Sequence, residues 1–172
     1  AVRLDPADGE LAAELARIQV YSSAMLTTDA EKKARLEEAL ITINQAKDVD
    51  PENSTVRAVR SFALDWYSSL SLVDPEEAEL TLLEASQEAV AALQFDNQNT
   101  LALAYYAEIL NDQMNWLQAE QYISQALLRD PSIMDVHRVN AIIQETLGNY
   151  SLAIDAYKRA AEIAPNLTFL YI

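Results

Sequence analysis

Alanines recur seven residues apart along the second half of the chain, with a large apolar residue between the members of each pair. Ala119 and Ala126 flank Ile123, and Ala153 and Ala160 repeat the arrangement. Seven residues are two turns of an α-helix, so each pair shares one helix face, where small side chains let a neighbouring helix approach closely. The pattern therefore predicts helices that pack against one another through alanine.

The same pattern of small and apolar residues repeats at a fixed spacing along the chain. Pro131 and Pro165 lie 34 residues apart, and the apolar and small residues that precede them match at the same spacing. Extended upstream, the pattern gives four units. Their marker residues are Ala39, Ile43, Ala46 and Pro51; Ala85, Ala89, Ala92 and Asn97; Trp116, Ala119, Ile123, Ala126 and Pro131; and Tyr150, Ala153, Tyr157, Ala160 and Pro165.

In this period and these residues the chain resembles the tetratricopeptide repeat (TPR) family, whose unit of about 34 residues is a helix-turn-helix. Alanine stands where the family's first helix has glycine. The matching first-helix positions are Ala12, Leu15, Ala16 and Gln19; Val59, Phe62, Ala63 and Trp66; Leu103, Tyr106, Ala107 and Leu110; and His137, Asn140, Ala141 and Gln144.

The resemblance implies an all-α fold, a right-handed α-solenoid of about four TPR-like repeats forming a single domain over residues 1–172. The repeat units are expected at approximately 7–53, 54–99, 100–133 and 134–167, with 168–172 starting a further helix. Both ends of the chain read as cuts through a longer array, and the apolar last residues are expected to pack on the last hairpin or on another copy.

The first two units are longer than the others. Pro6 and Pro51 lie 45 residues apart, and Pro51 and Asn97 lie 46 apart, so each unit holds about a dozen extra residues. We expect elongated helices at 11–25, 29–47, 56–72 and 75–93. Shared equally, the extra residues would lengthen each helix by roughly 9 Å.

Helix starts are marked by capping residues. Four of the five prolines follow an aspartate, and in each of these pairs the aspartate is expected to cap a helix whose first turn holds the proline. Thr28 with Glu31, and Asp74 with Glu77, have the spacing of capping boxes.

Charge and composition exclude several classes of protein. With 12 basic and 27 acidic residues the formal net charge is −15, which would repel nucleic acid and anionic membranes. The 51% hydrophobic content argues against a disordered acidic tail, and no apolar run is long enough to insert directly into a bilayer. The compartment is left open.

The sequence offers little catalytic chemistry. It has no cysteine, no glycine-rich phosphate loop, and a single histidine, His137, which falls at a packing position. The acidic pairs Glu37 with Glu38 and Glu84 with Glu88 read as exposed helix faces, because no calcium-binding loop accompanies them. We therefore expect no catalytic residue, no metal site and no cofactor, and a protein that is not an enzyme.

The expected binding surface is the concave face, which first helices line in arrays of this kind. The residues that the alignment places there are Arg17, Arg57, Arg60, Tyr67, Glu108, Asn111, Asp135 and Arg138. Four arginines in so acidic a chain suggest a groove for an acidic protein or peptide, because guanidinium binds carboxylate through two hydrogen bonds. The alternative is internal pairing, of Asp135 with Arg138 and of the other arginines with nearby acids.

The most direct interpretation is a protein–protein interaction scaffold with a peptide- or protein-binding groove. Two alternatives stay open. One is a self-assembly scaffold that associates through its exposed ends, and the other is an accessory or regulatory domain of a larger enzyme, including a membrane-bound one.

Overall fold

The computed structural model describes residues 8–167, and every regular element in that range is helical. The helices are α1 (Gly9–Ser23), α2 (Asp29–Val49), α3 (Ser54–Ser68), α4 (Pro75–Phe95), α5 (Thr100–Asp112), α6 (Trp116–Arg129), α7 (Met134–Thr146) and α8 (Tyr150–Ile163). The predicted all-α fold is confirmed. The further helix expected at 168–172 and the packing expected of the chain ends lie outside the described residues.

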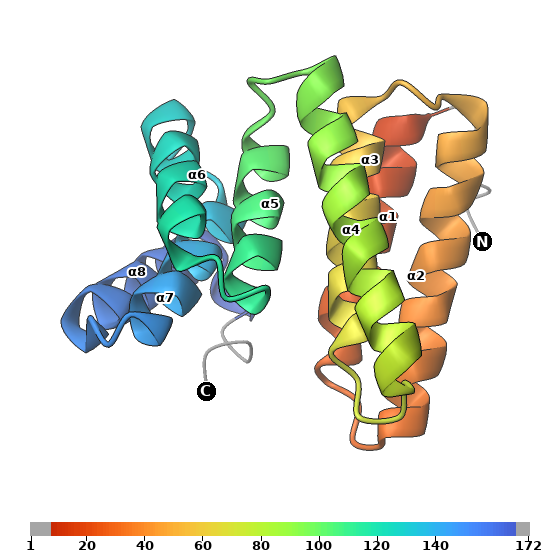
Figure 1. Cartoon of the computed structure of the whole chain (residues 1–172), viewed down its shortest axis with the longest axis horizontal. Helices are drawn as coiled ribbons and strands as arrows, with labels where there is room; N and C mark the ends of the chain where they lie inside the picture. The colour runs from red at the N-terminus through yellow and green to blue at the C-terminus, as the bar shows by residue number, and fades with distance from the viewer. Residues whose placement is uncertain (1–7, 168–172) are drawn as a thin grey trace. The chain divides into compact units, whose positions relative to one another are not determined.

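The chain divides into two compact units, Ala1–Asn97 (unit 1) and Gln98–Ile172 (unit 2). Unit 1 contains the hairpins α1–α2 and α3–α4, and unit 2 contains α5–α6 and α7–α8 (Figure 1). In each unit the first helix of the second hairpin packs against both helices of the first hairpin, α3 on α1 and α2, and α7 on α5 and α6. The four repeat boundaries stay a prediction.

The alanine stripe forms most of the buried face of the second helices. The buried residues are Leu36, Ala39, Ile43 and Ala46 in α2; Ala85, Glu88, Ala89 and Ala92 in α4; Ala119, Ile123 and Ala126 in α6; and Ala153, Ala156 and Ala160 in α8. Small side chains on this face let the first helices lie close against it. The positions of the small residues thus determine which face of each second helix packs against the first helices.

The extra length of unit 1 is concentrated in its second helices. α2 and α4 each have 21 residues against 14 in α6 and α8, whereas α1 and α3 have 15 against 13 in α5 and α7. Ala39 is the eleventh residue of α2 and Ala119 the fourth of α6, so residues 29–35 extend α2 at its start. This extension is about 10 Å long, and the expectation of equal sharing is wrong.

Serine hydroxyls bond to backbone carbonyls near the ends of α1 and α3. Ser22 and Ser23 donate to the carbonyls of Gln19 and Val20, and Ser68 donates to the carbonyl of Asp65. Such bonds compete with the backbone ladder of the helix.

The aspartate–proline pairs behave in two ways. Asp74 caps α4, with Pro75 in its first turn, and its side chain accepts from the Glu76 amide. Asp50 and Asp130 instead follow the last residues of α2 and α6 with backbone angles outside the helical region. Because a residue before proline is disfavoured in the α region, these two aspartates end a helix, and the expected capping there is wrong. Asp5 lies outside the described residues.

Each hairpin of unit 2 turns through a residue with positive φ. Met114 has φ 60° and Gly148 has φ 78°, and in both turns the next amide returns to a carbonyl five residues earlier, Asn115 to Leu110 and Asn149 to Gln144, at 2.8 Å. Glycine adopts this conformation at no steric cost, whereas methionine is strained in it. Met114 is 74% exposed, so tertiary packing does not explain its presence.

Met114→Gly is expected to stabilise unit 2 by about 1 kcal/mol, because it removes the left-handed strain. Gly148→Ala is expected to destabilise the same unit by a similar amount. Urea denaturation followed by the fluorescence of Trp116 measures both. Met114→Ala keeps the Cβ atom and is the control, and an equal gain from this variant would show that strain is not the cause.

No helix among residues 8–167 has both the length and the apolar character required to span a membrane.

Candidate functional site

Equivalent positions in the first helices lie at equal distances from the start of each helix. Asp50, Asp96 and Asp130 each follow a second helix, and the next helix begins four residues later in every case. Counted in this way, the position of Ala107 and Ala141 falls in α3 on Ser61, which is fully buried. The alignment that used Ala63 is therefore two residues late.

A pair of equivalent contacts supports the new register of α3. The Arg57 Nε donates to the carbonyl oxygen of Pro51 at 2.6 Å, and the His137 Nε2 lies 2.8 Å from the carbonyl oxygen of Pro131. Arg57 thus stands where α7 has His137, at a position expected to pack against the second helix. The expected placement of Arg57 and Arg60 on the concave face followed from the wrong register of α3.

The two arginines instead converge on one buried carboxylate of α4. Glu88 is 7% exposed. It pairs with Arg57 at 2.8 Å, with Arg60 at 3.1 Å, and with Lys47 of α2 at 2.5 Å. We call these four residues the Glu88 cluster. It joins three helices of unit 1 through charge.

The place in unit 2 that is equivalent to the Glu88 cluster holds two aromatic side chains. Tyr106 stands in α5 where Arg60 stands in α3, and it packs edge-on against Tyr122 of α6 with ring centroids 4.8 Å apart. Glu88 stands in α4 where α6 has Tyr122, since both lie three residues after the first alanine of the stripe. A buried ion pair and an aromatic pair thus occupy equivalent places.

Glu88 was expected on an exposed face, and that expectation is wrong. Glu84 has a side chain that is 49% exposed and binds Arg60 at 2.6 Å, whereas Glu88 is one turn further along and directly precedes Ala89 of the buried stripe. The position of Glu88 at the edge of the alanine stripe is the feature of the sequence that could have indicated its burial. The Arg60 Nε is satisfied by Asn44 of α2 at 2.7 Å.

The other two predicted residues of unit 1 have partners of their own. Arg17 pairs with Glu14 one turn earlier in α1, at 2.7 Å. The Tyr67 hydroxyl donates to Glu77 at 3.1 Å, and the Lys33 ammonium lies 5.5 Å from the centre of the Tyr67 ring. Glu77 was expected in a capping box with Asp74 and instead accepts this hydroxyl.

The four predicted residues of unit 2 lie on its two adjacent first helices. Arg138 of α7 donates to both carboxylate oxygens of Glu108 of α5, at 2.6 and 2.5 Å, and both residues are buried. The Tyr105 hydroxyl donates to Asp135 at 2.8 Å. Asn111 is 8% exposed, and its Oδ1 atom is buried without a hydrogen-bond partner. These side chains form one buried polar row across the two helices.

Asp112 lies next to this row, at the exposed end of α5. Desolvation, followed by repulsion from Glu108, raises its pKa from 3.8 to about 6. A carboxylate at a helix C-terminus also faces the negative end of the helix dipole. The folded pKa lies above the unfolded value, so the stability contributed by Asp112 is present below about pH 4 and is lost as the pH rises through about 6.

Asp112→Asn is therefore expected to raise the stability of unit 2 at pH 7 and to leave it unchanged at pH 4. Denaturation followed by Trp116 fluorescence at both pH values measures the difference. Asp130→Asn is the control, and its effect on stability should have the opposite sign. Hydrogen bonds from Ser132 lower the pKa of Asp130, so removal of this carboxylate should lower the stability at pH 7. A gain from Asp112→Asn that is equal at both pH values would contradict the assignment.

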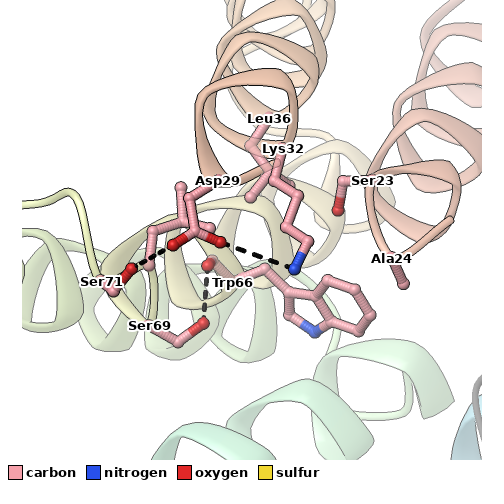
Figure 2. A pocket seen from close by; sticks show the side chains of 9 residues that line it. Ser23, Ala24, Asp29, Lys32, Leu36, Trp66, Ser69 and Ser71 are labelled. Carbon is pink, nitrogen blue, oxygen red and sulfur yellow. Dashed lines mark hydrogen bonds and ion pairs between the residues drawn. The ribbon is translucent and has the colours of Figure 1, made fainter. Parts of the chain in front are cut away.

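A pocket of about 410 Å³ opens at the turn end of unit 1. The ends of α1 and α3, the start of α2 and the turn after α3 form it (Figure 2). The residues that line it are Ser23, Ala24, Asp29, Lys32, Leu36, Trp66, Ser69, Leu70 and Ser71. Sequence reasoning missed this pocket, although the excess length of the first two units pointed to added structure there.

The polar side chains of the pocket are linked to one another. Asp29 accepts from the Ser71 hydroxyl at 2.5 Å and pairs with the Lys32 ammonium at 3.6 Å, and Figure 2 shows both contacts. The Ser69 hydroxyl donates to the carbonyl of Trp66. The pocket is also lined by the indole of Trp66 and the side chains of two leucines. It therefore combines an apolar wall with a carboxylate and an ammonium group.

Across residues 8–167 no three His, Cys, Asp or Glu side chains are placed to hold a metal ion. His137 is held against the Pro131 carbonyl.

Solved structures resemble the chain in fold. A thermophilic TPR protein of Thermus thermophilus matches 97% of this chain and 81% of its own, with a TM-score of 0.72 at 20% identity. PilF of Pseudomonas aeruginosa matches 92% and 69%, with a TM-score of 0.54 at 16% identity. The TPR domain of Arabidopsis OM64 matches 80% and 98%, with a TM-score of 0.51 at 16% identity.

No protein-family model matches the sequence, and comparison with curated proteins gives no match. The helical hairpins, the buried alanine stripe and the structural likeness agree with one another. The chain has the all-α helical-repeat fold of TPR proteins, as its sequence predicts.

Proposed function

We propose that the chain is a protein-interaction module that binds a protein or peptide along its first helices. The observation that supports this most directly is the buried polar row of unit 2, formed by Glu108, Asn111, Asp135 and Arg138. These residues lie on adjacent first helices, and the buried Oδ1 of Asn111 has no hydrogen-bond partner. A buried acceptor in this state costs free energy, and a partner that opens this end of the row and donates to it would recover that cost.

The partner of this surface need not be acidic. Arg17, Arg57, Arg60 and Arg138 all pair with carboxylates of their own unit, which supports the alternative of internal pairing. The row in unit 2 and the adjacent Asp112 hold three carboxylates and one guanidinium. A polar or basic segment fits that balance better than an acidic one.

A photo-crosslinking experiment tests the proposal. A benzophenone side chain replaces Asp112 or Thr146, which are exposed at equivalent ends of α5 and α7, or, as matched controls, Gln121 or Gln125, which are exposed on α6. Irradiation in cells is expected to link the protein to a partner from positions 112 and 146 only. Crosslinks confined to α6, or none from any position, would remove the first helices as the contact surface.

A further inference from the structure

The extra length of α2 builds the pocket of unit 1. Residues 29–35 have no counterpart in α6, where the alanine stripe begins at the fourth residue. Asp29 and Lys32, which supply the charged groups of the pocket, both belong to this extension. The pocket is therefore an addition to the repeat, and its charged groups come from residues that have no counterpart in α6.

We propose that this pocket binds an arginine side chain of a protein partner, with the guanidinium on Asp29 and its flat face against Trp66. The inference extends the proposed interaction role to a second surface of the chain.

The Asp29 carboxylate is suited to this role. The hydrogen bond from Ser71 lowers its pKa, so it is ionised at neutral pH. Its remaining partner is Lys32, one helical turn away at 3.6 Å, and the side chains of Lys32 and Asp29 are 34% and 47% exposed. An exposed pair of this kind is weak. A guanidinium offers two parallel hydrogen bonds to one carboxylate and would displace the ammonium.

The walls of the pocket favour a flat cation with an apolar stem. Trp66 is half-buried and stacks edge-on with Tyr21 and Phe62 behind it, at centroid distances of 5.8 and 5.3 Å. This packing fixes the indole, and indole is the strongest aromatic partner for a cation. Leu70, which is half-buried, can cover the methylene groups of an arginine stem.

The charge of unit 1 favours a basic partner. Its residues include 19 acidic and 8 basic side chains, which leaves a formal charge of −11 out of the −15 of the chain. Most of the cations are bound internally, three of them in the Glu88 cluster. The electrostatic field of this negative charge attracts basic segments and repels acidic ones.

The test uses the full chain with Trp116→Phe, which leaves Trp66 as the only tryptophan. The probe is a blocked tripeptide with arginine at its centre, and the control is the same tripeptide with citrulline, which has the same shape without the charge. Trp66 fluorescence and its indole N–H resonance are followed during titration. We expect saturable binding of the arginine peptide with a Kd on the order of 1 mM, and no saturation with citrulline.

Two variants separate the pocket from general electrostatics. Asp29→Asn is expected to weaken binding by about tenfold or more, whereas Glu76→Gln, an equal change of charge in the first turn of α4, should leave it unchanged. Lys32→Ala should strengthen binding, because it removes the competitor. Unchanged thermal unfolding of Asp29→Asn would show that the fold is intact.

The proposal is overturned if the arginine peptide does not bind, if citrulline binds equally, if a glutamate tripeptide binds in its place, or if Asp29→Asn and Glu76→Gln have the same effect. None of these results would affect the crosslinks from positions 112 and 146, so the two proposals fail separately.

Discussion

Glu88→Ala is expected to destabilise unit 1 by about 3–5 kcal/mol, because it leaves three cations without their shared carboxylate. For a unit of this size the loss corresponds to a fall in Tm of about 12 °C or more. Trp66 fluorescence in a Trp116→Phe background follows this unit alone, since each unit contains one tryptophan.

The matched control for this variant is Glu84→Ala. Glu84 also binds Arg60, but its side chain is 49% exposed, so its removal should cost less than about 1 kcal/mol. Equal losses from the two variants would show that burial does not set the strength of the Glu88 cluster.

Arg138→Met is expected to destabilise unit 2 by about 3–5 kcal/mol, because Glu108 would then be buried without its bidentate partner. Denaturation followed by Trp116 in a Trp66→Phe background gives the free energy of unfolding.

The double variant Glu108→Leu with Arg138→Met decides whether the ion pair is needed for stability. Well-packed apolar residues often replace a buried ion pair without loss, so the double variant should recover more than half of what Arg138→Met loses. If the losses of Glu108→Leu alone and Arg138→Met alone simply add in the double variant, the two residues act independently. Their contact between α5 and α7 then contributes no coupling energy.

Sequence reasoning succeeded where structure is set by neighbouring residues. The start of α2 follows from Thr28 and Glu31, which form the expected reciprocal capping box, with the Glu31 amide on the Thr28 hydroxyl and the Thr28 amide on the Glu31 carboxylate. The alanine stripe fixed the buried faces of α2, α6 and α8 in the same way, because a spacing of seven is a local property of one helix.

The register of α3 could not be decided in this way. Ser61 and Ala63 are both small and both buried, so the alanine pattern fits either, and only the distance from the preceding helix end separates them. The partners of Arg57 and Arg60 then depend on that register, and Glu88 lies 31 and 28 residues away in sequence. Such pairings arise from tertiary packing, which residue spacing does not reveal.

The pocket escaped prediction for a related reason. The excess length of unit 1 was visible in the proline spacing, but how it would be divided depended on competing helix ends. Ser23, Asp29 and Trp66 come from three different helices and meet only after the hairpins have packed.

The size of the extension in α2 and α4 has a consequence for how such a chain can grow. Seven residues make nearly two complete turns, so an insertion of that size rotates the rest of the helix by only about 20° and returns the same side of it to its neighbours. A repeat can therefore gain or lose heptads without disturbing its partners. New recognition surfaces can be added at the hairpin tips while the contacts that hold the array together are inherited unchanged.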